Sequence, residues 1–337
     1  MKNLKNIGEF GLITRITKNF NQQLRSTILP LGDDCAVYSG SASKYQIVST
    51  DALVENIHFK FSTISPEQLG QKAIAVNISD IAAMGGIPTR VLITLGVSKK
   101  VSTSFLKKLY NGIHKTCTLY GIELIGGDTV SSPKNFFMNV TIIGEAKQGK
   151  LFTRNGAKKG DLIFTTGTLG DSSLGLKISS NKNWKCTQKS KKYLIKKHLL
   201  PTPRLKESQL LARSNHKITS MIDISDGLVQ DLNHICKQSG AGAVIYEEKL
   251  PKSLEFSKVC KENRVKPLPF VLEGGEDYEL LFTLPSDGVK KLSRQFEKAK
   301  ALVTHIGEIT ESASKVSLLR QNGKREILRQ LSGFNHF

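Results

Sequence analysis

Six short segments of the chain place carboxylates beside glycines or at the ends of apolar runs, and any fold must account for all six. The chain has 29 acidic residues against 49 lysines and arginines, so a fold that gathers this many carboxylates must also supply positive charge. Oxygen ligands without a set of His and Cys suit a hard cation such as Mg²⁺, which in proteins usually arrives with phosphates. The segments read Gly32-Asp33-Asp34-Cys35, Ser49-Thr50-Asp51, Asn77-Ile78-Ser79-Asp80, Gly126-Gly127-Asp128, Asp223-Ile224-Ser225-Asp226-Gly227 and Glu273-Gly274-Gly275-Glu276-Asp277.

The length of 337 residues exceeds what one hydrophobic core usually fills, so we expect two domains, 1–149 and 150–337. Strand-like and helix-like patterns alternate in both, which predicts an α/β or α+β fold. The start shows no basic segment followed by an apolar one, and no apolar run approaches about twenty residues, so a cytoplasmic protein without membrane association is expected. The five cysteines form no C-x-x-C pair, which favours reduced, structural thiols.

One helix is predicted to carry an acid toward the body of the protein. Ser65 and Pro66 are typical of a helix start, and Gly85-Gly86 of a helix end. Within this helix Val76 and Asp80 fall on one face, among apolar residues. Because an unpaired buried carboxylate is very costly, Asp80 predicts a cation or several hydrogen-bond donors beside it.

The net charge of +20 raises the question of nucleic-acid binding, and the region 177–206 is where a basic strip would lie. It is rich in lysine, contains no acid, and interleaves Trp184 and Tyr193, an arrangement that could track a phosphate backbone. A solvated helix face is the stronger interpretation, because lysine is abundant throughout and no helix-turn-helix, RNP-like or zinc-finger pattern is present. Nucleic acid is therefore not the expected partner.

Each acidic segment also has a simple structural interpretation. Asp33-Asp34 could form only a turn, Asp226 only a helix N-cap, and Glu276-Asp277 only the mouth of a hairpin. Six in order at strand ends instead favour phosphoryl transfer between two polyanions, where several Mg²⁺ ions neutralise charge. The turn Gly167-Thr168-Leu169-Gly170-Asp171 is a weak further sign of a phosphate cradle, since it lacks the Gly-Lys-Ser/Thr end of a Walker A sequence.

These segments resemble the thiamine-monophosphate kinase family, in order and with its approximate spacing, from Gly8-Glu9-Phe10 to Phe337. That family belongs to the ATP-binding superfamily that also contains aminoimidazole ribonucleotide synthetase and selenophosphate synthetase. The resemblance implies an N-terminal α/β domain whose sheet pairs in a homodimer to form a barrel-like core, followed by a C-terminal α/β domain. The matching stretches are Gly32-Asp33-Asp34-Cys35-Ala36, Ser49-Thr50-Asp51, residues 72–85, Gly126-Gly127-Asp128-Thr129, Ile224-Ser225-Asp226-Gly227-Leu228 and Gly274-Gly275-Glu276-Asp277-Tyr278-Glu279-Leu280.

The resemblance also implies a reaction and a set of site residues. ATP and thiamine monophosphate would give ADP and thiamine diphosphate by direct in-line transfer, with several Mg²⁺ ions and without a side-chain nucleophile or base. The implied magnesium ligands are Asp34, Ser49, Thr50, Asp51, Asp80, Asp128, Asp223 and Asp226. The implied ATP contacts are Gly127, Asp128, Arg154 and Ser225. The implied contacts of thiamine monophosphate are His58, Glu276 and a C-terminal aromatic residue, Phe334 or Phe337.

Two alternatives remain open on the sequence. A sister enzyme of the same superfamily would make another phosphorylated product from ATP, although the reactive Cys and Lys expected of selenophosphate synthetase in a glycine-rich N-terminal loop are not found. A nucleic-acid-binding protein would use the basic strip at 177–206 and keep the acidic segments only as remnants. The intact acidic segments favour the kinase over both.

Overall fold

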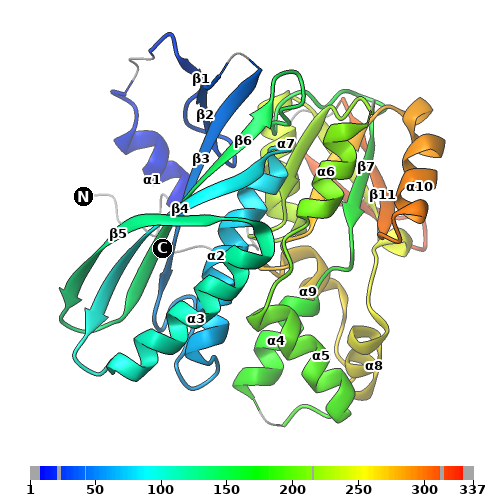
Figure 1. Cartoon of the computed structure of the whole chain (residues 1–337). Helices are drawn as coiled ribbons and strands as arrows, with labels where there is room; N and C mark the ends of the chain where they lie inside the picture. The colour runs from blue at the N-terminus through cyan, green and yellow to red at the C-terminus, as the bar shows by residue number, and fades with distance from the viewer. Residues whose placement is uncertain are drawn as a thin grey trace.

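The computed structural model describes residues 8–20, 24–41, 43–181, 183–214, 216–311 and 315–328. The expected substrate contact Phe334 and its alternative Phe337 lie outside these ranges. Within them the chain forms two mixed β-sheets with helices packed against them, one sheet in each half of the sequence (Figure 1). The expected α/β class is therefore confirmed as a two-domain fold.

The first sheet has six strands in the order β1-β2-β3-β6-β4-β5, all antiparallel except the parallel pair of β4 and β5. Helices α2 and α3 pack together, and α2 lies against β3, β4 and β6. The elements are α1 (Gly8–Ile16), β1 (Thr27–Leu29), β2 (Ala36–Ser39), β3 (Lys44–Val54), α2 (Pro66–Ala83), β4 (Ile87–Ser98), α3 (Thr103–Tyr120), β5 (Glu123–Ser132) and β6 (Phe137–Lys147).

The second sheet has seven strands in the order β13-β12-β9-β11-β7-β10-β8, antiparallel except for β9 and β12. Helix α7 packs on one face, and apolar residues of α6 and α10 join those of β7 and β10 on the other. The elements are β7 (Leu162–Thr166), α4 (Asp171–Ser180), α5 (Gln188–Leu199), α6 (Leu205–Arg213), β8 (Ser220–Asp223), α7 (Leu228–Ser239), β9 (Gly242–Tyr246), η2 (Glu247–Lys249), α8 (Leu254–Glu262), α9 (Leu268–Glu273), β10 (Leu280–Leu284), η3 (Ser286–Gly288), α10 (Val289–Lys298), β11 (Val303–Thr310), β12 (Val316–Leu319) and β13 (Arg325–Ile327).

Helix α2 begins and ends as its sequence predicts. Ser65 is the N-cap, and its hydroxyl accepts from the backbone N–H of Gln68. The N–H of Ser65 in turn donates to Gln68 Oε1, which completes a capping box. Pro66 occupies the first turn, and the helix stops before Gly85, whose φ is 73°. The sequence thus places a long, well-capped helix at the centre of the molecule (Figure 1).

Helix α2 also joins the two halves of the chain, since it contacts β8 and α6 of the second domain. Ser208 Oγ of α6 donates to the carbonyl of Ala82 at 2.5 Å. Gln209 Nε2 donates to the carbonyls of Gly85 at 3.1 Å and Gly86 at 2.8 Å. Any residue on the C-terminal half of α2 is therefore brought against the second domain.

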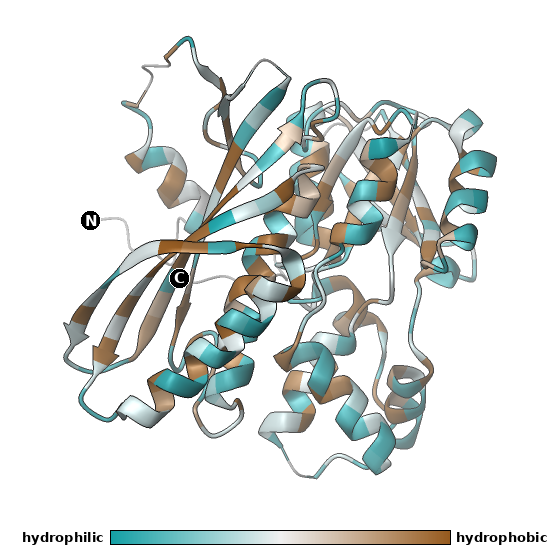
Figure 2. Cartoon of the chain, in the orientation of Figure 1, coloured by the Kyte–Doolittle hydropathy of each residue, from teal (hydrophilic) through white to brown (hydrophobic). Residues whose placement is uncertain are grey.

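Strand β5 is an exposed edge. Leu124, Ile125 and Val130 are each more than 40% exposed, although apolar side chains of this size are usually buried. Brown, apolar positions accordingly appear along β5 in Figure 2. An edge of this kind offers unpaired backbone groups and apolar surface to another chain.

Among the described residues, no helix is long and apolar enough to cross a bilayer. The five cysteines are all unpaired thiols, and four of them are buried.

Candidate active site

Three carboxylates, here called the acid cluster, converge where the two domains meet. One oxygen from each of Asp34, Asp80 and Asp223 lies within 4.8 Å of the others. Asp34 comes from the turn before β2, Asp80 from α2 and Asp223 from the end of β8. The packing of α2 against β8 is what brings the third carboxylate to the other two.

Two serines orient the acid cluster. Ser49 Oγ of β3 donates to Asp80 Oδ2 at 2.5 Å. Ser79 Oγ of α2 donates across the domain junction to Asp223 Oδ2 at 2.6 Å. Each hydroxyl fixes one carboxylate oxygen of its partner.

Arg154 contacts the neighbouring acids Asp33 and Asp34, which have different roles. Asp33 accepts hydrogen bonds from the backbone N–H groups of Asp34 and Arg154, both at 3.0 Å, so it shapes the turn. Arg154 Nη2 donates to Asp34 Oδ1 at 2.5 Å. Asp34 Oδ2 is buried without a hydrogen-bond partner, which is the environment that a bound cation would satisfy.

Burial and mutual repulsion raise the pKa of the clustered carboxyls. Burial, followed by Asp34, raises the pKa of Asp223 to about 8. Burial, followed by Asp51 and Asp223, raises the pKa of Asp80 well above its usual value. Burial also raises the pKa of Asp34, against the opposing effect of Arg154. A divalent cation would relieve this repulsion, and a donor set made of oxygens fits Mg²⁺.

Strand β3 presents the expected ligands Asp51 and Thr50 to opposite faces, because side chains alternate along a strand. Asp51 lies toward the acid cluster, where burial and Asp34 raise its pKa. Thr50 Oγ1 is instead 3.1 Å from Thr141 Oγ1 and accepts from Asn139 Nδ2 at 3.0 Å. The Thr50 hydroxyl is therefore not brought to the acid cluster.

Gly127 and Asp128 lie within β5, not at a strand end as the sequence suggested. Asp128 pairs with Thr94 of β4, and β4 and β6 both separate β5 from β3. Neighbouring strands lie about 4.8 Å apart, so β3 and β5 are separated by roughly 14 Å. A Cβ on Gly127 would lie 1.9 Å from the Ile93 carbonyl oxygen, so this close pairing requires glycine. A single copy of the chain leaves both residues on its exposed edge, away from the acid cluster.

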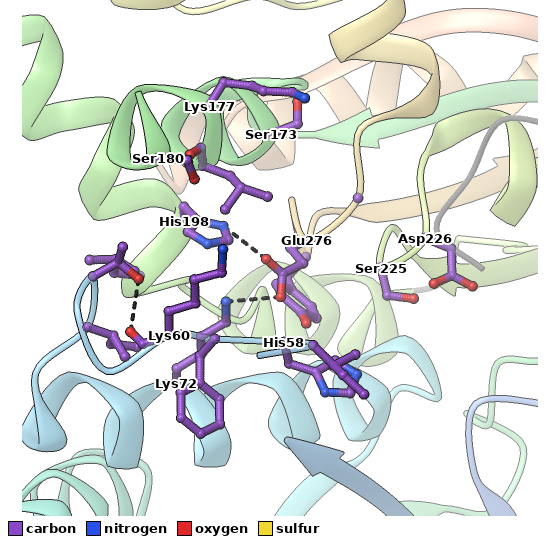
Figure 3. A pocket seen from close by; sticks show the side chains of 18 residues that line it. His58, Lys60, Lys72, Ser173, Lys177, Ser180, His198, Ser225, Asp226 and Glu276 are labelled. Atoms are coloured by element: carbon purple, nitrogen blue, oxygen red, sulfur yellow. Dashed lines mark hydrogen bonds and ion pairs between the residues drawn. The ribbon is translucent and has the colours of Figure 1, made fainter. Parts of the chain in front are cut away.

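A pocket of about 480 Å³ opens beside the acid cluster, between the loop after β3 and the helices α4 and α5 (Figure 3). Four of the expected site residues line it together: His58, Ser225, Asp226 and Glu276. Phe59, Ile64 and Leu199 supply apolar walls. Tyr278 lines the pocket as well. Burial, then Glu276, and then Asp51, Asp223 and Asp80 raise the pKa of Tyr278 well above its usual value, so the pocket and the acid cluster adjoin. A flat, partly apolar ligand with one anionic end suits this arrangement.

His58 enters the pocket with a defined tautomer. The backbone N–H of Val54 donates to His58 Nδ1 at 2.9 Å. An imidazole nitrogen that accepts carries no proton, so the neutral ring carries its proton on Nε2. His58 can therefore donate a hydrogen bond to a ligand through Nε2, and in that form it cannot take a proton there.

The interpretation of Asp226 as a helix N-cap is wrong. The backbone N–H groups of Asp226 and Gly227 donate to Asp231 Oδ2 at 3.2 and 3.1 Å, so Asp231 takes the capping role from inside α7. Asp226 Oδ2 accepts from Gln230 Nε2 at 2.9 Å, and its side chain faces the pocket. The Asp226 carboxylate therefore belongs to the pocket and does not cap α7.

The phosphate cradle suggested by Gly167-Thr168-Leu169-Gly170-Asp171 is also wrong. The N–H groups of Gly170 and Ser172 donate to the two oxygens of Asp277, at 2.7 and 3.2 Å. Because a carboxylate of the chain itself occupies the start of α4, these donors are not open to a phosphate.

The pocket residues that were not predicted include Lys72, His198 and Tyr278. Lys72 lies two helical turns before Asp80 on the same buried face of α2, so the periodicity that selected Asp80 also marks Lys72. His198 follows Ser190 and Leu194 at four-residue spacing, and all three are buried in α5. Tyr278 has a φ of 50°, and no sequence pattern predicted this backbone conformation.

The basic strip at 177–206 is not uniformly a solvated face. Trp184 packs edge-on against Phe270 with ring centroids 6.4 Å apart, and Tyr193 Oη donates to Asp171 at 3.2 Å. These aromatic rings are held in the protein instead of being presented to stacking bases. Lys177 lines the pocket, so the strip takes part in the site.

Residues 32–146 match the AIR synthase related protein N-terminal domain, and residues 158–319 the AIR synthase related protein C-terminal domain. The chain is 39% identical to the thiamine-monophosphate kinase of Buchnera aphidicola subsp. Schizaphis graminum over 331 residues, covering 98% of both chains. It is 36% identical to the thiamine-monophosphate kinase of Bacillus subtilis, covering 98% of this chain and 99% of that one. The solved structure of AaThiL complexed with AMPPCP and TMP aligns with a TM-score of 0.86 at 34% identity, covering 100% of this chain and 99% of that chain.

Proposed function

The chain belongs to the thiamine-monophosphate kinase family of AIR synthase related proteins, and from this premise we propose that it transfers the γ-phosphoryl group of ATP to thiamine monophosphate. The products are ADP and thiamine diphosphate, a step of thiamine diphosphate biosynthesis. The observation that carries the proposal is that the acid cluster adjoins a pocket lined by His58 and Glu276. Phosphoryl transfer needs such a meeting of a polyanion-binding centre and an acceptor pocket.

The acid cluster would hold Mg²⁺ together with Asp51 and Asp226, and bound Mg²⁺ would neutralise the charge of the two phosphate groups as they approach. Arg154 is paired with Asp34 and would exchange that partner for phosphate oxygens of ATP. Ser225, between Asp223 and Asp226, would contact the nucleotide beside them. His58 and Glu276 would bind thiamine monophosphate, with its phosphate directed toward Asp226.

The transfer requires no general base in this proposal. A phosphate monoester loses its second proton with a pKa near 6, so the acceptor oxygen is already ionised at neutral pH. The tautomer of His58 supports the same conclusion, because Nδ1 already accepts from the backbone N–H of Val54 and Nε2 carries the proton. The chain would act by holding the two phosphates in line and by neutralising their charge.

The proposal includes a homodimer whose paired N-terminal sheets form the barrel-like core, and a domain boundary near residue 150. The exposed apolar edge at β5 supports an interface there. Asp128 and Gly127 lie on that edge, away from the acid cluster of their own chain. Pairing with a second copy would bring them into a nucleotide site. The boundary is supported by the division of the strands, since β6 ends at Lys147 and β7 begins at Leu162. Free thiols and use of ATP support a cytoplasmic location.

One assay tests the proposed activity. Purified protein is incubated with ATP, Mg²⁺ and thiamine monophosphate, and thiamine diphosphate and ADP are quantified after chromatography. We expect one ADP for each thiamine diphosphate, no product from unphosphorylated thiamine, and none in excess chelator. Asp51→Asn should lower turnover on the order of 10²-fold or more, because an amide holds Mg²⁺ weakly. The matched control Asp287→Asn, on the exposed turn η3, should be normal. Absence of product, or normal turnover in Asp51→Asn, would contradict the proposal.

A further inference from the structure

Glu276 is held in the pocket wall by two side chains from two other parts of the chain. Lys72 Nζ of α2 lies 2.9 Å from Glu276 Oε1, and His198 Nδ1 of α5 lies 2.9 Å from Glu276 Oε2. Figure 3 shows both contacts converging on the carboxylate. The Lys72 and His198 side chains are 1% and 6% exposed, whereas that of Glu276 is 25% exposed. The two partners are thus buried behind a carboxylate that faces the cavity.

The backbone at Glu276 is fixed as tightly as its side chain. Its φ is 64°, a conformation that residues other than glycine seldom adopt, and its N–H donates to the Ser225 carbonyl at 2.7 Å. A Cβ on the preceding Gly275 would lie 2.6 Å from the same carbonyl oxygen, so glycine is needed for this approach. Backbone strain of this kind persists only where the surrounding structure imposes it, and it is frequent at binding sites.

His198 is held in place by the packing of α4 against α5. A Cβ on Gly175 of α4 would lie 2.1 Å from the Leu194 carbonyl oxygen, which shows how closely the two helices cross. Ser172 Oγ of α4 lies 3.2 Å from His198 Nδ1. Since a carboxylate only accepts, the Nδ1 proton of His198 points to Glu276.

We propose that Lys72 and His198 are positioning residues, which hold the Glu276 carboxylate so that its remaining lone pairs meet the ring portion of thiamine monophosphate. The proposal rests on the proposed function and extends it to two residues and to α5 of the basic strip. Thiamine monophosphate offers two groups that a carboxylate binds, an amino group on the pyrimidine ring and a positive charge on the thiazolium ring. Burial alone would raise the pKa of Glu276, but Lys72 and then His198 lower the pKa to about 2, so the carboxylate is ionised.

The first test separates substrate binding from turnover. His198→Leu should raise the KM for thiamine monophosphate roughly 10- to 100-fold, the range expected when a charged group loses one hydrogen bond, with saturated turnover within about threefold. His198→Asn should restore most of the affinity, because the asparagine amide can donate from the position of Nδ1. The matched control Lys192→Gln, on the exposed side of α5, should leave both constants unchanged.

A double-mutant cycle then asks whether the two residues act through Glu276. In a Glu276→Gln background, adding His198→Leu or Lys72→Met should change kcat/KM by less than about twofold, whereas independent effects would multiply. The His198 arm alone suffices if Lys72→Met fails to fold. Two substrate analogues extend the cycle: oxythiamine monophosphate lacks the amino group, and 3-deazathiamine monophosphate lacks the ring charge. The wild-type preference for thiamine monophosphate over one of them should be lost in both Glu276→Gln and His198→Leu.

The outcomes distinguish this inference from the proposed function. Two results would overturn the positioning roles alone, provided that the wild type is active. One is that the effects on kcat/KM multiply in the Glu276→Gln background. The other is that His198→Leu retains the preference for thiamine monophosphate over both analogues. A loss in His198→Asn as large as that in His198→Leu also overturns them. A wild type that neither binds thiamine monophosphate by calorimetry nor forms thiamine diphosphate overturns the proposed function and this inference with it.

Discussion

Replacing Asp223 by Asn should stabilise the protein in the presence of a chelator while it weakens the response to magnesium. Asp223 is 2% exposed, and burial together with Asp34 raises its pKa from the ordinary value of 3.8 to about 8. Asparagine has the same shape, carries no charge, and can still accept the hydrogen bond from Ser79. The substitution therefore removes an ionisation and little else.

The sign and size follow from proton linkage. The folded state keeps the Asp223 proton up to about pH 8, whereas the unfolded chain releases it near pH 3.8, so ionisation favours the unfolded chain as pH rises. At pH 7 the unfolded chain lies about 3 pH units above its pKa, which corresponds to on the order of 4 kcal/mol. The difference in unfolding free energy between Asp223→Asn and wild type should be near zero at pH 4, grow to this value by pH 7 and level off above pH 8.

Urea unfolding in excess chelator, at several pH values, measures that difference directly. In thermal unfolding the same difference corresponds to a rise of roughly 6 °C at pH 7. Adding Mg²⁺ should then stabilise wild type more than the variant, because only wild type keeps the full set of charged ligands. Asp287→Asn serves as the exposed control. A variant that is no more stable than wild type at pH 7, or a difference that does not grow with pH, would refute the account of the acid cluster.

Three further predictions concern the pocket, the basic strip and the domain core. His58→Ala should raise the KM for thiamine monophosphate and keep saturated turnover within roughly tenfold; a 10³-fold loss with a missing pH-rate limb would identify a catalytic base instead. Lys192→Gln with Lys196→Gln should leave saturated turnover unchanged, with any loss confined to low substrate and removed by salt, whereas loss of a tight nucleic-acid complex would support the binding-protein alternative. Arg204→Met should cost about 3–5 kcal/mol in urea unfolding, because Glu279, 1% exposed and bonded twice to Arg204 at 2.5 Å, would be left charged and buried. Adding Glu279→Gln should recover much of that loss, and an additive loss would contradict the ion-pair account.

Elements whose ends and buried faces are marked by nearby residues were predicted from the sequence. The capping box of Ser65 and the glycines after the helix located α2, and its periodicity placed Asp80 toward the interior, where Ser49 meets it. The glycine-bounded acids likewise located the turn at Asp34 and the start of α7. These features depend on contacts within a few residues, which a sequence displays directly.

Features that depend on approach between distant segments were not predicted. The capping of α7 by Asp231 and of α4 by Asp277 replaced the simpler roles given to Asp226 and to the glycine turn. The contacts of Glu276 with Lys72 and His198 join three parts of the chain that no local pattern connects. The position of Asp51 and Asp128 inside strands, not at their ends, follows from the long pairings of β3 with β6 and of β4 with β5.

The acid cluster has a consequence for how the protein is made. Asp34 and Asp80 belong to the first domain, whereas the guanidinium of Arg154 and the third carboxylate, Asp223, come from later in the chain. On a ribosome the first domain emerges and folds while its two acids still lack the arginine that pairs with one of them. Docking of the second domain then brings the carboxyl group of Asp223 to the same place, where it must either take up a proton or repel the other two carboxylates. We therefore expect the magnesium level of the cell to govern the yield of folded protein during synthesis, before any nucleotide is bound.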